Sequence, residues 1–227
     1  MKFLTVSGPP STGKTSIILR VIDVLKEKNI KPGVVKFDCL LSDDDILYKK
    51  KNVPVKKGLS GGLCPDHYFV SNVEACVKWG FDIGLDMLIS ESAGLCNRCS
   101  PHIREITAVC VIDNLSGVNT PKKVGPMLKS ADIVIITKGD IVSQAEREVF
   151  ASRVKNANPS SIIMHVNGIT GQGAYELATI FLESKDIYTL KGKKLRFSMP
   201  AALCSYCLGE TRIGESYQMG NVRKIDI

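Results

Sequence analysis

Short apolar segments of strand length recur along the chain, and most of them are separated by stretches long enough to form helices. Strands that are apolar on both faces are typical of a parallel sheet that is covered on both sides. The pattern therefore predicts an α/β fold in which helices flank a mainly parallel sheet. The expected strands are Phe3–Ser7, Gly33–Phe37, Met87–Ser90, Ala108–Ile112, Ile133–Thr137 and Ile162–Val166.

Helical periodicity is clearest in residues 15–28, where apolar residues recur on one face and the pattern stops before Pro32-Gly33. Residues 66–79 and 171–184 also predict helices. The last forty residues lack this periodicity and contain several glycines. We therefore expect one α/β domain over residues 1–187, followed by a small cysteine-containing appendage over residues 188–227.

Composition narrows the class of protein. A hydrophobic fraction of 44% and a charged fraction of 23% exclude disorder as the dominant state. No apolar run approaches the roughly 20 residues of a membrane-spanning helix, and the apolar start is too short for a signal peptide. We expect a cytoplasmic protein with no membrane segment. The net charge of +7 is spread over short, scattered lysine groups, so nucleic acid is not favoured as a partner.

Residues 8–15, GPPSTGKT, match the phosphate-binding pattern G-x-x-x-x-G-K-[ST] between an expected strand and an expected helix. Backbone N–H groups of such a loop surround phosphates at a helix N-terminus. Lys14 would bridge the β- and γ-phosphates, and Thr15 would offer its hydroxyl to Mg²⁺. The expected nucleotide contacts in this loop are Gly8, Pro10, Ser11, Thr12, Gly13, Lys14, Thr15 and Ser16.

An acidic residue near the end of another strand is needed to complete a Mg²⁺ site. Glu91 follows the apolar segment that ends at Ser90, and Gly94 is placed to approach a γ-phosphate through its backbone N–H. The alternative is that Glu91 only caps a turn.

Base recognition is expected from Thr137-Lys138-Gly139-Asp140, which follows a very apolar strand and matches [N/T]-K-x-D. A carboxylate at Asp140 would accept hydrogen bonds from two guanine N–H groups that adenine lacks, and the Lys138 stem would pack over the base. GTP is therefore favoured over ATP. Asn167 and Gly168, after the next strand, either complete the base pocket or form a simple turn.

Eight cysteines in a reducing compartment indicate metal or redox chemistry rather than disulfides. Cys64 and His67 are suitable ligands for Ni²⁺ or Zn²⁺. One pair cannot fill a four-coordinate site, but a two-fold dimer would supply two pairs. The alternative is a buried cysteine beside a helix-capping histidine.

Two C-x-x-C pairs, Cys96/Cys99 with His102 just beyond and Cys204/Cys207 in the appendage, would supply four thiolates. These would suit zinc or an iron–sulfur cluster if the appendage folds back to the nucleotide site. Alternatively, each pair is a redox dithiol or is structural. The remaining cysteines lie among apolar residues and are expected in the core: Cys39, Cys76 and Cys110.

These motifs together resemble the metallocentre-assembly GTPases of the HypB and UreG type, the hydrogenase nickel-insertion and urease accessory proteins. The matching motifs span about residues 1–185 in the family order. They are GPPSTGKT, Lys36-Phe37-Asp38, Gly61-Gly62-Leu63-Cys64-Pro65-Asp66-His67, Glu91-Ser92-Ala93-Gly94, Thr137-Lys138-Gly139-Asp140 and Thr170-Gly171-Gln172-Gly173.

The resemblance implies a SIMIBI-like P-loop fold and slow hydrolysis of GTP to GDP and phosphate, with Lys14, Asp38 and Glu91 as catalytic residues. Asp38 would lie in the first switch, near Mg²⁺ or the attacking water, and Glu91 would belong to the Mg²⁺ shell. Cys64 and His67 would hold metal across a GTP-dependent homodimer. The partners implied are a client metalloenzyme of nickel or iron–sulfur type and other maturation factors.

The sequence departs from this family in three places. Two residues separate Cys64 from His67 instead of one, Thr137 replaces the usual Asn, and the Cys204/Cys207 tail has no counterpart in the family pattern. Two other functions stay open: a metal or iron–sulfur carrier whose dimer is locked by nucleotide, and a P-loop kinase or molybdopterin-guanine-dinucleotide accessory protein. A kinase needs an arginine lid, and the sequence contains no arginine cluster of that kind. Arg98 and Arg104 are the only candidates near the second switch, residues 91–102.

Overall fold

The computed structural model describes residues 1–94, 99–197, 210–217 and 222–227. Within these ranges it contains a seven-stranded parallel sheet in the order β3-β2-β4-β1-β5-β6-β7. The expected α/β fold with a parallel sheet is therefore confirmed. The strands are β1 (Lys2–Ser7), β2 (Pro32–Asp38), β3 (Val55–Leu59), β4 (Met87–Ser92), β5 (Thr107–Asp113), β6 (Ile133–Thr137) and β7 (Ile162–His165).

The strand β3 is the one that the apolar pattern missed. Its sequence, VKKGL, contains two adjacent lysines, and it pairs on one side only, with β2. An edge strand can keep charged side chains, which also discourage pairing with another chain. The six predicted segments differ because most of them lie inside the sheet, where burial on both faces demands apolar residues.

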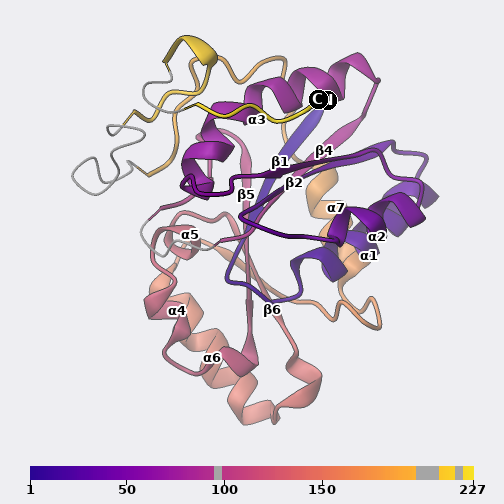
Figure 1. Ribbon diagram of the computed structural model, residues 1–227. Coiled ribbons are helices and arrows are strands. Elements are labelled where there is room, and N and C mark those ends of the chain that lie inside the picture. Colours follow the sequence, from indigo (N-terminus) through magenta and orange to yellow (C-terminus); the bar gives the residue numbers. More distant parts are fainter. Residues whose placement is uncertain (95–98, 198–209, 218–221) are drawn as a thin grey trace.

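Helices cover both faces of the sheet (Figure 1). On one face lie α1 (Lys14–Glu27), α2 (Asp44–Lys50) and α7 (Ala174–Leu182). On the other lie α3 (Pro65–Asp82) and the group α4 (Thr120–Lys123), α5 (Pro126–Lys129) and α6 (Gln144–Ala157). No helix among the described residues has the length and apolar character needed to cross a bilayer.

The alternation of side chains along β1 shows how the two faces are built. Leu4 and Val6 pack against α1 residues such as Val21, whereas Phe3 points to the opposite face and packs with α3. Full burial of each such side chain contributes about 1.5–3 kcal/mol relative to exposure. The strand is therefore fixed between two apolar layers, which holds the loop that follows it in place.

The C-terminal residues are fastened to α3 rather than left on the surface. Leu190, Leu195, Ile213 and Ile225 are buried in the same apolar cluster as the α3 side chains. An antiparallel bridge between Lys194 and Arg212 joins two parts of the segment. The described part of residues 188–227 therefore completes the core on this face of the sheet, and the division at residue 187 stays a prediction.

Asn72 carries much of this attachment. It is fully buried on α3. Its Nδ2 donates to the carbonyl oxygens of Tyr68 (2.8 Å) and Arg223 (2.9 Å), and its Oδ1 accepts from the backbone N–H of Ile225 at 2.8 Å. We expect Asn72→Ala to lower the free energy of unfolding by about 1–3 kcal/mol, because buried backbone groups lose their partners.

Urea denaturation would measure this loss. The matched control is Asn156→Ala, at an exposed position of α6, which should change stability by no more than about 0.5 kcal/mol. Equal effects of the two substitutions would contradict the role of Asn72.

Candidate nucleotide site

The predicted phosphate residues lie at the carboxyl end of the sheet, where open parallel sheets bind their ligands. A cavity of about 410 Å³ is lined by residues of the loop after β1, by the end of β2, by α2 and by the end of β4. The predicted residues among its lining are Pro10, Ser11, Gly13, Lys14, Thr15, Ser16, Asp38 and Glu91.

Two glycines let the backbone pack closely beside this cavity. A Cβ on Gly8 would collide with the carbonyl oxygen of Val111, and one on Gly94 would collide with that of Gly8. Gly94 also has a φ of +62°, which favours glycine. The end of β4 is thus held directly against the loop after β1. Gly13, with a φ of +88°, starts α1, whose first turn contains no acidic residue and is therefore suited to an anion.

Lys14 is buried beneath this loop. Its Nζ donates to the carbonyl oxygens of Gly8 (2.9 Å) and Pro9 (2.8 Å). Burial lowers the pKa of Lys14 to about 8, although the carboxylate of Glu91 acts in the opposite direction. The ammonium therefore lies inside the loop, where a phosphate would be surrounded by backbone N–H groups.

Glu91 is fully buried and lies within β4 rather than after the strand. Its carboxylate accepts hydrogen bonds from Thr15 Oγ1 (2.8 Å), Lys36 Nζ (2.7 Å) and Tyr48 Oη (2.7 Å). The sequence paired Thr15 with Glu91, and the structure brings these two together. It also adds Lys36 and Tyr48, which sequence reasoning did not place at this site.

Asp44 is another acidic residue at this site, and the sequence analysis did not predict it. Its Oδ2 accepts from Thr15 Oγ1 (3.1 Å) and lies 2.6 Å from Lys36 Nζ. The run Asp43-Asp44-Asp45, close after the second strand, was the available signal. Asp38 ends β2 and lies 4.0 Å from Lys36 Nζ, and its Oδ1 accepts from the backbone N–H of Cys39.

The charges in this cluster stabilise one another. Burial alone would lower the pKa of Lys36, but Glu91 and Asp44 together raise it above its ordinary value. Burial would raise the pKa of Asp44, but its hydrogen bond and charge interaction with Lys36 lower it. Burial and the neighbouring Glu91 carboxylate raise the pKa of Tyr48 well above 10. At neutral pH Lys36 is therefore protonated, Asp44 is ionised and Tyr48 donates as a neutral phenol.

These donors fit Mg²⁺, which prefers oxygen ligands. The hydroxyl of Thr15 donates its proton to the carboxylates, so its lone pairs stay available for a cation. The described residues contain no group of three His, Cys, Asp or Glu side chains arranged to hold a metal alone. In the usual mode of Mg²⁺ binding, one or two protein ligands act together with phosphates and waters.

A second predicted segment lies beside the phosphate loop. Thr137 Oγ1 donates to the carbonyl oxygen of Thr12 (2.8 Å), and Lys138 Nζ donates to that of Ser11 (2.8 Å). Asp140 and Asn167 line a separate cavity of about 220 Å³ next to this segment. Gln172, from the Thr170-Gly171-Gln172-Gly173 motif, also lines this cavity, whereas sequence reasoning missed two other lining residues, Arg147 and His165.

The turn at Asn167-Gly168 is fixed against α1. Asn167 Oδ1 accepts from the backbone N–H groups of Ile169 (2.8 Å) and Thr170 (3.1 Å). Arg20 Nε donates to the carbonyl oxygen of Gly168 at 3.2 Å. The turn is therefore both a structural connection and part of the wall of this cavity.

The structure describes only some of the predicted cysteine and histidine metal ligands. Cys64 is the half-buried N-cap of α3, and His67 is fully buried in the first turn of that helix. Cys99 is buried, whereas Cys96, Cys204 and Cys207 lie outside the described residues. The Cys64/His67 site and the pairing of the C-x-x-C motifs therefore stay predictions.

His102 is structural rather than a ligand. It is fully buried, with its ring nitrogens near Thr5 Oγ1 (2.9 Å), Ser7 Oγ (3.3 Å) and the carbonyl oxygen of Met127 (3.1 Å). Burial, assisted by the charge of Arg196, lowers the pKa of His102 to about 3. The neutral ring connects the polar side of β1 to the α5 region.

Two of the three cysteines expected in the core are there. Cys76 and Cys110 are fully buried, and burial raises the pKa of each thiol to about 12. The expectation was wrong for Cys39, which is only half-buried because it lies just beyond the end of β2. Its Sγ donates to the carbonyl oxygen of Gly61 at 3.4 Å.

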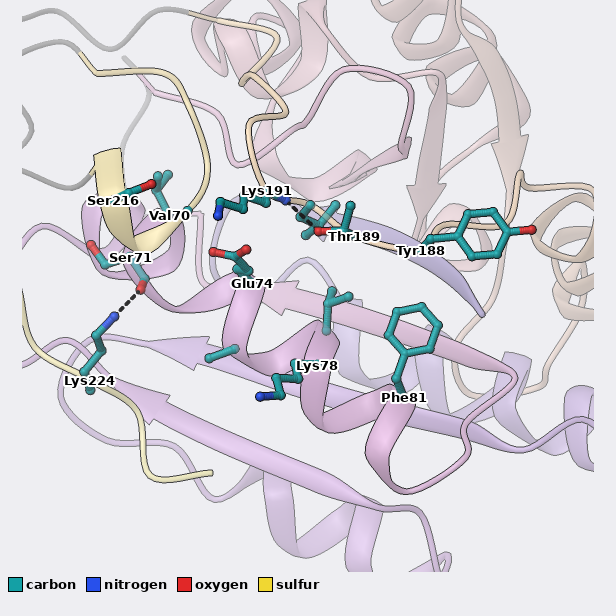
Figure 2. A pocket seen from close by; sticks show the side chains of 14 residues that line it. Val70, Ser71, Glu74, Lys78, Phe81, Tyr188, Thr189, Lys191, Ser216 and Lys224 are labelled. Carbon is teal, nitrogen blue, oxygen red and sulfur yellow. Dashed lines mark hydrogen bonds between the residues drawn. The ribbon is translucent and has the colours of Figure 1, made fainter.

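A further cavity of about 780 Å³ lies between part of α3 and the C-terminal segment (Figure 2). Its lining includes Glu74, Lys78 and Phe81 of α3 and, from the C-terminal segment, Tyr188 and Lys191. None of the predicted site residues that the structure describes lines this cavity. It is therefore distinct from the nucleotide site.

Comparison with known proteins agrees with this architecture. Residues 2–165 match the family described as CobW/HypB/UreG, nucleotide-binding domain, so the chain belongs to this family of P-loop NTPases. It is 52% identical to the uncharacterized protein MJ0120 of Methanocaldococcus jannaschii, over 100% of this chain and 97% of that protein. It is 28% identical to the urease accessory protein UreG of Yersinia enterocolitica, over 78% of this chain and 86% of UreG.

The fold is also similar to a solved structure of HypB from Helicobacter pylori in complex with nickel. The TM-score is 0.65 at 19% sequence identity, and the match covers 83% of this chain and 91% of HypB. At this identity the likeness concerns the fold alone.

Lys14 provides a direct test of the phosphate site. We expect Lys14→Ala to weaken nucleoside triphosphate binding about 30-fold or more, because it removes a buried cation from the anion site. Equilibrium binding of a fluorescent GTP analogue would measure this, and circular dichroism would check the fold. Lys129→Ala, at an exposed position of α5, is the matched control. Undiminished affinity in Lys14→Ala would contradict the assignment.

Proposed function

We propose that the protein is a GTP-preferring molecular switch that hydrolyses GTP to GDP and phosphate and acts as a homodimer in assembling or activating a metalloenzyme. Nucleotide binding is supported mainly by one observation: side-chain hydrogen bonds join the two segments that are predicted to bind the phosphates and the base. The Thr137-Lys138-Gly139-Asp140 segment is hydrogen-bonded to the phosphate loop, so the phosphate cavity and the cavity containing Asp140 are neighbours.

In this proposal each residue has a defined task. Lys14 and the N-terminus of α1 neutralise and orient the phosphates. Thr15 offers its hydroxyl oxygen to Mg²⁺, with Glu91 and Asp44 behind it, and Asp38 orients the attacking water. Mg²⁺, when bound with the nucleotide, supplies charge neutralisation on the phosphate oxygens.

The phosphate site is connected to the cysteine-containing loop through the backbone. The N–H of Ser60 donates to the carbonyl oxygen of Asp38 (2.9 Å), and the N–H of Gly61 donates to that of Cys39 (2.8 Å). A displacement of Asp38 on binding a γ-phosphate would therefore be passed to the segment that leads to Cys64. This connection supports a switch that couples nucleotide state to metal affinity.

The proposed metal, nickel or zinc, is inferred from the related proteins and from the types of residue at the predicted metal site. UreG and HypB, to which this chain is related, are named as urease accessory protein and hydrogenase maturation factor. Cys64 is the more accessible of the two predicted ligands, so we propose that it holds nickel or zinc opposite Cys64 of a second copy, with His67 contributing after α3 shifts. A kinase function is less well supported, because no arginine is among the described residues that line the phosphate cavity.

Asp140→Asn tests the preference for guanine. An amide cannot accept from both guanine N–H groups, so GTP affinity should fall about tenfold or more, while affinity for xanthosine triphosphate should rise. Competition binding with GTP, ATP and xanthosine triphosphate would measure both changes. Asp82→Asn, at an exposed position of α3, should change neither. An unchanged order of preference would mean that another segment reads the base.

Cys64→Ala tests the metal part separately. We expect it to reduce nickel or zinc bound by the GTP-loaded dimer to near zero, because it removes the accessible thiolate. Elemental analysis beside size-exclusion mass would measure metal per dimer. Cys39→Ala, which removes another half-buried thiol near the same loop, should retain the metal. If Cys64→Ala retains its full metal content, the metal site must instead be assigned to the C-x-x-C pairs.

Measuring metal release distinguishes a switch that uses GTP hydrolysis from a carrier whose dimer is only locked by bound nucleotide. Release that requires GTP cleavage supports the switch. Release that proceeds equally with a non-hydrolysable analogue would instead favour a carrier.

A further inference from the structure

Lys36 occupies an unusual position for a lysine. It lies in β2 with 3% of its surface exposed, and its register partner in β4 is Glu91. Neighbouring residues in register on parallel strands point to the same face of the sheet. Lysine is almost never fully buried unless it is paired. The strand pairing therefore holds an ammonium group against the Glu91 carboxylate.

The ammonium and the Thr15 hydroxyl share the same two oxygen atoms. Lys36 Nζ lies 2.6 Å from Asp44 Oδ2 and 2.7 Å from Glu91 Oε1. Thr15 Oγ1 donates to these same atoms at 3.1 and 2.8 Å. A cation bound at Thr15 would therefore share its second shell with the ammonium group of Lys36.

The charge balance shows what Lys36 does at this position. Without it, the carboxylates of Asp44 and Glu91 would face each other across Thr15, one of them fully buried. An uncompensated buried charge is strongly destabilising. Tyr48 adds a neutral hydrogen bond from α2 to Glu91 but no charge. Among the described residues near these carboxylates, Lys36 is the cation that contacts both.

We propose that Lys36 is a built-in cation that keeps Thr15, Asp44 and Glu91 assembled before Mg²⁺ arrives, so that Mg²⁺ binds tightly only together with the triphosphate. Lys36 is a positioning residue in this account. Its charge opposes free Mg²⁺ and attracts the triphosphate, whose own oxygens then supply the missing negative charge. The carboxylates that Lys36 contacts, Asp44 and Glu91, are the ones that would lie behind a Mg²⁺ ion held at Thr15. The inference rests on the proposed nucleotide site but not on hydrolysis, base choice or metal cargo.

Lys36→Met tests this with two readouts that do not depend on activity. We expect free Mg²⁺ to bind the variant at least about tenfold more tightly than the unmodified protein in the absence of nucleotide, by isothermal titration calorimetry. We also expect a melting temperature several degrees lower without Mg²⁺, and recovery of much of this loss in Mg²⁺. The unmodified protein should show little stabilisation by Mg²⁺ alone.

Two control variants separate this role from that of an ordinary ion pair. Lys57→Met removes the ion pair between Lys57 Nζ and Asp45 Oδ1 (2.6 Å), which joins β3 to α2. It should lower the melting temperature without any recovery in Mg²⁺. Lys36→Arg keeps the charge and should keep weak binding of free Mg²⁺.

An unchanged affinity of Lys36→Met for free Mg²⁺, with the same loss of stability in the presence and absence of Mg²⁺, would overturn the proposal. If that variant does not fold, Lys36→Met combined with Glu91→Gln decides, because it removes the fully buried negative charge together with the positive one. Recovery of the fold supports the proposal, and continued failure overturns it. If the Lys36 variants contradict this proposal but Lys14→Ala still loses nucleotide binding, the proposed nucleotide site is retained and only the role of Lys36 is rejected.

Discussion

The candidate site depends on one buried carboxylate. Glu91 has no exposed surface, and it receives hydrogen bonds from three separate elements: α1 through Thr15, β2 through Lys36 and α2 through Tyr48. A buried charge must be compensated in this way or it destabilises the fold. The same requirement holds α2 against the sheet and places the Thr15 hydroxyl at the mouth of the phosphate loop. The stability of this region and its chemistry therefore share one set of contacts.

Two kinds of connection leave this cluster. One is made by side chains and joins the phosphate loop to the segment that contains Asp140, through Thr137 and Lys138. The other is made by the backbone and joins the end of β2 to the loop before α3, through Ser60 and Gly61. A triphosphate would contact the origin of both connections. This arrangement supports the proposed switch, because a local change in charge can bias a neighbouring loop.

The part of α3 beyond its first turn has a different surrounding. There the C-terminal segment packs on the helix and leaves the large cavity between Glu74, Lys78 and Lys191 (Figure 2). α3 therefore begins at the cysteine-containing loop and continues beneath the C-terminal segment. The polar anchor at Asn72 joins this helix to the backbone of Arg223 and Ile225.

The sequence by itself determined the parallel sheet, the phosphate loop and the Thr137–Asp140 segment, because each is written in consecutive residues whose local pattern is sufficient. It did not determine β3, whose lysines hide an edge strand, or the roles of Lys36, Asp44 and Tyr48. Those roles arise because the strand order places β2 directly beside β4 and aligns Lys36 with Glu91. Strand order and register depend on contacts between residues far apart in the chain, so only the tertiary structure decided which charges meet. The same holds for His102, which follows the Cys96/Cys99 pair closely in the sequence but is buried beside β1 as a neutral ring.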